Sequence, residues 1–304
     1  MASHPISASP LLQAVSSIAL EKGTRDQFVA NISPEWCTQH SVLGGYLNAL
    51  MLSAAQKLNA LEFGEERFPD PIHVFVQFLH MVPPGQVVVT CKHLRVSSRQ
   101  CVVRVEVART AASGKPSTPA TVGIVTCANI SKEKGLTQHS KPAFAVPLPN
   151  RHTECIKIDD PVVDSTPVTS RLNWVAPKAA NGLWGHRVGG HHREVWVSFR
   201  DGSNISDLLH LALLSDMPLQ PAATHQAGFY LKYALSTLCM TVEFKKHPDP
   251  STQWVMIRSN SHLVSNGRYD VNIQILDEEG NILALSNHVV YISELRARGK
   301  GAKL

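Results

Sequence analysis

An aspartate within an apolar helix pattern is the residue of this sequence best suited to chemistry. Asp216 comes four residues after Ala212 and seven after Leu209, so it falls on the apolar side of the predicted helix. A carboxylate there is costly unless it is paired, and the negative end of the helix dipole disfavours its charge. Both effects predict a raised pKa and a role as a general base. The alternative is a solvated carboxylate at a frayed helix end before Pro218.

A pair of glycines opens another predicted helix, at 42–58. Gly44 and Gly45 are poor helix formers, so their position needs a reason. Close packing against another backbone is one reason, because glycine has no side chain to keep two chains apart. The other is that amide groups at the helix N-terminus face an anion or a polarised carbonyl. The sequence leaves both interpretations open.

Polar residues in the strand-like runs near the C-terminus are less specific. Thr237 lies in a β-rich run with Ser236 as a rival beside it, and His288 lies in an alternating run. Threonine is common in strands, and a lone, partly buried histidine is more often structural than catalytic. Residue type and spacing alone therefore assign these three residues no role.

Composition excludes several classes of protein. Of 304 residues, 43% are hydrophobic and 17% charged, which excludes disorder for most of the chain. At roughly 150 residues per domain, about two domains are expected. No apolar run approaches the ~20 residues of a membrane-spanning helix, and the first residues lack a secretory signal pattern. The net charge of +5 is spread along the chain, so no nucleic-acid partner is predicted.

Cysteine and histidine spacing predicts no metal and no cofactor. The six cysteines include no C-x-x-C pair, and most lie in apolar strand-like runs. Free thiols of this kind indicate a reducing intracellular compartment. The glycine-rich segment 185–192 holds three histidines but matches no standard zinc spacing, so it is predicted as a surface loop.

The elements that must position these residues repeat along the chain. Each half is predicted to hold a helix followed by four strands. The helices are expected at 42–58 and 205–215, and the strands at 72–79, 86–96, 100–109 and 120–129, then at 236–245, 253–263, 268–276 and 282–292, with one more at 194–199. Such an internal repeat of over 100 residues predicts a duplicated domain.

The predicted architecture is α+β, with two helix-wrapped antiparallel sheets joined edge to edge by a long linker. Edge pairing would remove exposed sheet edges, and a ligand cleft is expected between the halves. The linker is placed at 136–190, where six prolines and little periodicity occur. The N-terminal domain is therefore predicted at 1–135 and the C-terminal domain at 191–304.

Several motifs, in this order, resemble the double-hotdog acyl-CoA thioesterases, and most of all the fungal thioesterase-like proteins. The first half carries GGYLNAL from Gly44 and VFVQFLH from Val74. The second half carries LLSD ending at Asp216, LSTL around Thr237, and LALSNH ending at His288. The resemblance covers about 36–129 and 194–292. It implies a double hotdog and hydrolysis of an acyl-CoA or acyl-carrier thioester by water, without a covalent nucleophile.

The resemblance also implies roles for the site residues. Asp216 matches the family's helix aspartate, which activates the water, and Thr237 matches its strand hydroxyl. His288 stands where the family usually has glutamine; a neutral imidazole can still donate to or accept from a water, but it adds a titratable group. Contacts to the substrate or its oxyanion are expected from Gly44, Gly45, Tyr46 and Ser236.

The chain ends in Ala302-Lys303-Leu304, a variant of the Ser-Lys-Leu peroxisomal address. This tail predicts a peroxisomal import receptor as a partner and a peroxisomal location, with the cytoplasm as the alternative. Together with the resemblance, it leads us to expect a peroxisomal acyl-CoA thioesterase. Service in a biosynthetic pathway instead of general lipid turnover is a further expectation. The fold class is compatible with a homo-oligomer.

Two other functions stay open at this point. One is a hotdog lyase such as a hydratase or dehydratase, although the sequence lacks the Asp/His signature that those enzymes need. The other is a protein that binds an acyl or polyketide ligand without hydrolysing it, which the histidine at 288 keeps open. A serine hydrolase is disfavoured because no G-x-S-x-G motif occurs.

Overall fold

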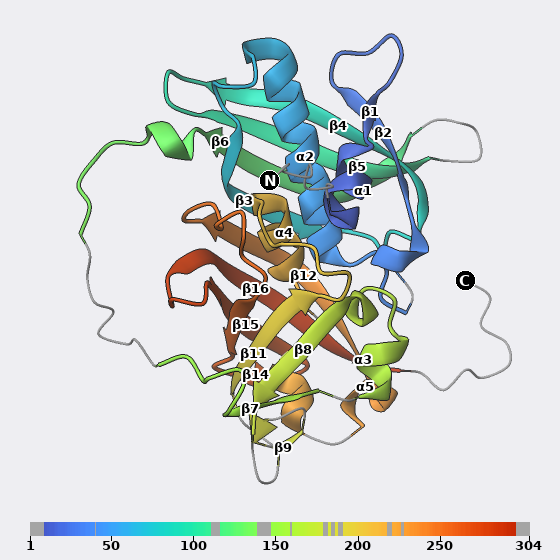
Figure 1. Ribbon diagram of the computed structural model, residues 1–304. Coiled ribbons are helices and arrows are strands. Elements are labelled where there is room, and N and C mark those ends of the chain that lie inside the picture. Colours follow the sequence, from blue (N-terminus) through green and yellow to red (C-terminus); the bar gives the residue numbers. More distant parts are fainter. Residues whose placement is uncertain are drawn as a thin grey trace, which may run out of the picture.

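One continuous sheet of fourteen strands organises the chain (Figure 1). The computed structural model describes residues 9–39, 41–110, 116–138, 147–158, 160–178, 182–183, 186–187, 191–217, 221–225 and 228–295. The main strand order is β1-β2-β4-β5-β6-β3-β12-β16-β15-β13-β11-β8-β7, with β14 paired to β15. A separate pair joins β9 to β10.

The elements of the two halves have the following bounds. The helices are α1 Pro10–Ser16, α2 Gly44–Phe63, α3 Pro161–Ser165, α4 Leu208–Leu214 and α5 Phe229–Lys232. The first strands are β1 Ala19–Leu20, β2 Gln27–Ile32, β3 Asp70–Phe78, β4 Gly85–Val96, β5 Cys101–Thr110 and β6 Pro116–Ala128. The later strands are β7 Cys155–Lys157, β8 Leu172–Pro177, β9 Gly182–Leu183, β10 His186–Arg187, β11 His192–Phe199, β12 Tyr233–Phe244, β13 Val255–Asn260, β14 Val264–Ser265, β15 Arg268–Leu276 and β16 Ile282–Glu294.

The predicted duplication is confirmed by the strand order. Counted outward from the middle of the sheet, one half reads β3-β6-β5-β4-β2 and the other reads β12-β16-β15-β13-β11. The two halves meet where β3 pairs with β12 antiparallel, from Gln77 opposite Cys239 to His73 opposite Glu243. The predicted edge-to-edge joining of two antiparallel sheets is therefore confirmed as well.

Helices α2 and α4 lie beside one another on the same side of this sheet (Figure 1). The helix predicted at 42–58 is α2, and its first three turns are buried on nearly every side. The reason is that α2 packs against β3, β4, β5 and β6 and also contacts α1 and α4. A helix enclosed in this way needs no polar face. One hydrophobic core spans both halves.

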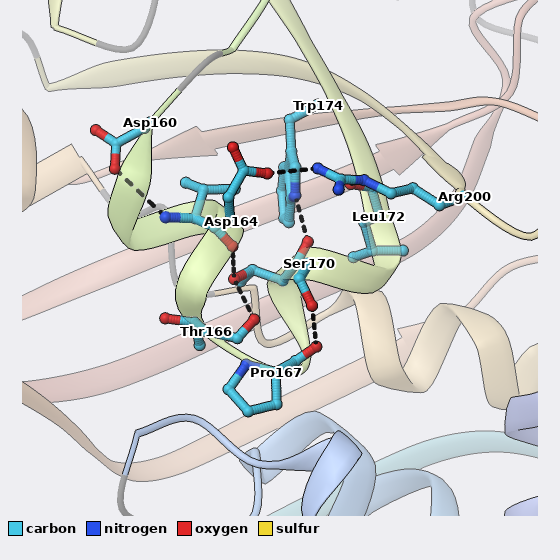
Figure 2. A network of polar contacts seen from close by, with 10 residues as sticks. Asp160, Asp164, Thr166, Pro167, Ser170, Leu172, Trp174 and Arg200 are labelled. Carbon is cyan, nitrogen blue, oxygen red and sulfur yellow. Dashed lines mark hydrogen bonds and ion pairs between the residues drawn. The ribbon is translucent and has the colours of Figure 1, made fainter.

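Part of the predicted linker belongs to the sheet, which differs from the expectation for 136–190. Strand β8 pairs with β11, and β7 pairs with β8. Figure 2 shows how the segment before β8 is held: Arg200 Nη2 donates to Asp164 Oδ1 at 2.6 Å, and Trp174 Nε1 donates to the Thr169 carbonyl at 2.9 Å. The second half of the sheet thus starts at Cys155. Strand β7 has only three residues, and in β8 the apolar Val175 stands between the buried Trp174 and Ala176, so the sequence shows no polar–apolar alternation.

The structure covers only part of the remaining sequence predictions, which concern the histidine-rich segment, the C-terminal tail, the cysteines and membrane-spanning helices. Of the segment 185–192, predicted as a surface loop, residues 185 and 188–190 lie outside the described residues, as does the whole of 302–304, whereas His186 and Arg187 form β10 and His192 begins β11. All six cysteines are free thiols. In the part of the chain that the structure covers, no helix is long and apolar enough to cross a membrane.

Candidate active site

Asp216 lies just beyond the end of α4, in the interface with α2. Asp207 caps the N-terminus of helix α4, and its side chain accepts a hydrogen bond from the Leu209 amide at 2.8 Å. The seven residues of this helix are all buried, and the chain turns at Ser215. The Asp216 side chain is thereby aimed at the N-terminus of α2, where the Gly45 amide donates to Oδ2 at 2.9 Å. Asp216 is only 5% exposed, so it is no solvated residue at a frayed helix end.

The two glycines are required by this approach of α2 to α4. A Cβ on Gly44 would lie 2.6 Å from Asp216 Oδ2, and a Cβ on Gly45 would lie 2.3 Å from the Leu213 carbonyl oxygen. Both distances are far below van der Waals contact. Close backbone packing and an amide that faces an anion were alternatives for the glycine pair. The structure shows that both apply.

The carboxyl group of Asp216 has a strongly raised pKa. Burial raises the pKa from 3.8 to about 7, against the opposing effects of the Gly45 amide, the Thr237 hydroxyl and the Gly44 amide. The raised pKa predicted from the sequence is confirmed, and burial is its largest cause. The helix end that faces the carboxylate is the N-terminus of α2, whose amides stabilise the charged form.

His288 lies on the helix-facing side of β16 and is fully buried. Its Nδ1 is 3.7 Å from Asp216 Oδ1, and its Nε2 is 2.7 Å from Ser286 Oγ. Burial lowers the pKa of His288 to about 4, and the Ser215 carbonyl acts in the opposite direction. The imidazole is therefore neutral at neutral pH, and no ion pair with Asp216 forms. A proton on Nδ1, with Nε2 accepting from the Ser286 hydroxyl, suits both neighbours.

Thr237 and Ser236 lie on opposite faces of β12. Thr237 Oγ1 donates to Asp216 Oδ1 over a long 3.5 Å, and Thr237 pairs with Val290, two residues from His288. Thr237 and His288 thus share the helix-facing side of the sheet. Ser236 is exposed on the other face, so the structure does not bring it to the site.

Tyr46 is also absent from the site, although the sequence placed it with the glycines. It comes two residues after Gly44, which is about 200° around a helix. Its ring stacks on Trp36 with centroids 5.3 Å apart, away from Asp216. The structure therefore brings together Asp216, Thr237, His288, Gly44 and Gly45, and leaves out Tyr46 and Ser236.

Three further residues of this region were missed from the sequence. Ser286 contacts His288 directly. The Phe78 ring lies only 2.8 Å from the position that a Cβ on Gly44 would take. Tyr269 is buried on β15, and burial together with the charges of Tyr230 and Asp216 raises its pKa far above the usual value. Only Ser286 had a readable signal, because residues two apart in a strand share a face.

Two family models match most of the chain. Residues 32–128 match the acyl-CoA thioesterase N-terminal domain, and residues 149–292 match the acyl-CoA thioesterase C-terminal domain. A thioesterase-like protein, TwmA of Talaromyces wortmannii, is 32% identical over 68 residues. That stretch covers 22% of this chain, and it spans only 19% of the length of TwmA.

Solved structures resemble the chain over nearly its whole length. A hot dog fold protein of unknown function from Alicyclobacillus acidocaldarius has a TM-score of 0.74 at 16% identity, over 94% of this chain and 99% of that one. A putative thioesterase II from Thermobifida fusca has a TM-score of 0.72 at 18% identity, over 95% and 99%. The acyl-CoA thioesterase II TesB2 of Mycobacterium marinum has a TM-score of 0.63 at 14% identity, over 95% and 99%. The predicted double hotdog fold is thus confirmed.

Proposed function

The chain belongs to the acyl-CoA thioesterase family and is a thioester hydrolase; we propose that Asp216 is its general base. The observation that supports this role is the Asp216 carboxyl group, which is buried, bonded to the Gly45 amide, and has a pKa of about 7. A general base works best when its pKa lies near the working pH. Thr237 and His288 face the other carboxylate oxygen, Oδ1, so one oxygen is held by the helix and the other meets the polar pair.

The proposed reaction starts with water bonded to ionised Asp216. Asp216 takes a proton as the water oxygen attacks the thioester carbonyl carbon, which gives a tetrahedral oxyanion. The carbon–sulfur bond then breaks, and the leaving thiolate takes up the proton held by Asp216, so the products are a carboxylic acid and a thiol. A thiol has a pKa of about 8.5, so its thiolate leaves readily and needs little acid catalysis.

Thr237 and His288 are proposed to orient this water. The neutral His288 can present an N–H at Nδ1, 3.7 Å from Asp216 Oδ1. In the double-hotdog thioesterases that the sequence resembles, the amide of a glutamine is usual at this position. The amides at the start of α2 were expected to stabilise the oxyanion. In this structure the Gly45 amide is bonded to Asp216, and the oxyanion role stays a prediction.

Release of free thiol from a panel of acyl-CoA thioesters tests the proposal. Wild type is compared with Asp216→Asn and Thr237→Val, and with Ser236→Ala as the matched control on the exposed face of the same strand. We expect Asp216→Asn to lose about 100-fold or more in kcat/KM and Ser236→Ala to keep full activity. An Asp216→Asn variant that keeps wild-type activity would exclude Asp216 as the base.

We also propose that the chain enters peroxisomes through Ala302-Lys303-Leu304. The support is the tail sequence together with an acyl-thioester substrate. A fluorescent protein carrying residues 296–304 should enter peroxisomes, and the same fusion without Leu304 should stay in the cytosol. Cytosolic signal from both fusions would remove this proposal.

Two finer expectations remain proposals. A biosynthetic role has only the short match to TwmA behind it, and the products that accumulate when the gene is deleted would test it. A homo-oligomer is tested by light scattering during size-exclusion chromatography, where a monomer mass of 33.3 kDa would rule it out.

A further inference from the structure

A buried asparagine on α2 has no partner for either polar atom. Asn48 is 0% exposed. Neither its Oδ1 nor its Nδ2 has a hydrogen-bond partner among the residues that the structure describes. A buried amide in this state costs free energy, because water would satisfy both atoms in the unfolded chain. Few buried polar groups in folded proteins stay unsatisfied, so an amide in this state calls for an explanation, and a bound ligand is one.

Asn48 projects toward the candidate active site. It follows Gly45 by three residues and Gly44 by four, and at about 100° of turn per residue its side chain points between theirs. The side of the helix at Gly44 faces Asp216 and the Phe78 ring, and the side at Gly45 faces the Leu213 carbonyl of α4. Side chains on a helix also lean toward its N-terminus. The backbone at Asn48 lies about 6 Å along the helix from that at Gly44, and its side chain leans back toward the glycines that meet Asp216.

A second buried group lies on the sheet below this part of α2. Thr121 on β6 is 0% exposed, and its hydroxyl has no partner within the described part of the chain. Thr121 pairs with Phe78, whose ring contacts the position beside Gly44, and with Val107, a core residue. The amide and the hydroxyl thus flank the Gly44 end of α2 from the helix and from the sheet.

We propose that Asn48, assisted by Thr121, binds a hydroxyl or keto oxygen on the acyl chain of the thioester. This inference rests on hydrolysis at Asp216. The oxygen would lie a few carbon atoms from the thioester carbonyl. Asn48 can donate from Nδ2 to a keto oxygen and accept at Oδ1 from a hydroxyl. A saturated chain would leave both atoms unpaired, so an oxygen-bearing acyl thioester is the preferred substrate class.

The test is a ratio of two substrates. Hydroxyacyl- or oxoacyl-CoA is compared with saturated acyl-CoA of equal length for wild type, Asn48→Leu and Thr121→Val. Wild type should prefer the oxygenated substrate by about 10- to 100-fold in kcat/KM, and Asn48→Leu should bring the ratio near one. Thr121→Val should lower the ratio less. Ser53→Ala is the control, because Ser53 is buried on α2 but donates to the Val15 carbonyl at 2.9 Å; its ratio should not change.

The outcomes separate this inference from the proposed function. Equal hydrolysis of both substrates by wild type, or an unchanged ratio in Asn48→Leu, would overturn the role of Asn48 and leave Asp216 as the base. If no acyl-CoA is hydrolysed, the dissociation constants of non-hydrolysable oxygenated and saturated acyl-CoA thioethers are compared instead. Tighter binding of the oxygenated thioether that disappears in Asn48→Leu supports the inference, and equal binding overturns it. Asn48→Ala serves where the leucine variant does not fold.

Discussion

The Gly45 amide donates to Asp216 Oδ2 over 2.9 Å, across 171 residues of sequence. This bond joins the N-terminal half of the molecule, which supplies α2, to the C-terminal half, which supplies the carboxylate. The candidate base is therefore positioned by a helix from the opposite half, so neither half contains the whole site. The duplicated domain supplies different parts from its two copies: a bare helix N-terminus from one and the polar side chains from the other.

Replacement of Gly45 by alanine tests how tightly this approach is set. The new Cβ would lie 2.3 Å from the Leu213 carbonyl and 3.1 Å from Asp216 Cβ, so α2 and α4 must move apart. Overpacking of this kind typically costs about 1–3 kcal/mol, and we expect lower thermal stability and at least tenfold lower kcat. Gly135→Ala is the control, because no heavy atom lies within 4 Å of its Cβ position. Wild-type kcat in Gly45→Ala would show that the spacing is not required.

The pH dependence of hydrolysis should follow Asp216 and not His288. Asp216 must be ionised to accept a proton, so kcat/KM should rise with pH through about 7 and then level off. His288, with a pKa of about 4, is neutral throughout this range. In His288→Gln the rise should stay near pH 7, with activity within about tenfold of wild type, because an amide can also donate. A rise near pH 4 that vanishes in His288→Gln would instead identify the imidazole as the base.

The strands and their duplication could be predicted because each half buries one continuous face. The run from Cys101 to Val107 alternates as the sheet requires, and it forms β5 as expected. Two elements of the linker were missed: β7 is only three residues long, and β8 carries an apolar residue, Val175, on its less buried face, so its sequence does not alternate. The burial of α2 on nearly all sides could not be predicted either, because its second neighbour, α4, comes from the other half.

The site could be predicted only in part. Asp216 could be predicted because an acidic residue on the apolar side of a helix breaks the usual hydrophobic pattern, which is expected mainly at functional sites. Thr237 and His288 needed the resemblance, since strand threonines and histidines are common. The structure does not bring Ser236 and Tyr46 to the cluster around Asp216, because Ser236 is on the exposed face of its strand and Tyr46 stacks on Trp36. Asn48 carried no signal, since its burial follows from the enclosure of α2 on nearly every side, which the sequence does not show.

Stability should fall as pH rises because of Asp216. Its pKa is 3.8 in the unfolded chain and about 7 in the folded protein, so between these values the folded state binds more protons. At about 1.4 kcal/mol per pKa unit, ionised Asp216 destabilises the fold by about 4 kcal/mol above pH 7. Asp216→Asn should therefore be more stable than wild type at pH 8, and the difference should shrink as pH falls and vanish below the unfolded pKa of 3.8.

Urea unfolding of both proteins across this pH range measures the difference. The comparison with wild type is needed because His288 acts in the opposite direction: its folded pKa of about 4 lies below the unfolded value of 6.5, so its contribution is lost as pH falls. A difference between variant and wild type that is independent of pH would mean that the pKa of Asp216 is not raised.

The hydroxyl of Ser286 should set which nitrogen of His288 carries the proton. Ser286 Oγ is 2.7 Å from Nε2, and both side chains are buried. When the hydroxyl donates to Nε2, the proton stays on Nδ1, which faces Asp216. Ser286→Ala removes this bond, so we expect kcat to fall about five- to tenfold with KM unchanged, as for the loss of one hydrogen bond. Ser286→Thr keeps a hydroxyl and should restore most of the rate.

A spectroscopic measurement separates this positioning role from a structural one. Nitrogen chemical shifts of the His288 ring distinguish the two neutral tautomers, and we expect one tautomer in wild type and in Ser286→Thr but a mixture in Ser286→Ala. A purely structural serine would lower the midpoint of unfolding in Ser286→Ala and leave the tautomer unchanged. Because the hydroxyl lies on the side of the ring away from Asp216, it can act on the base only through the proton that it holds at Nδ1.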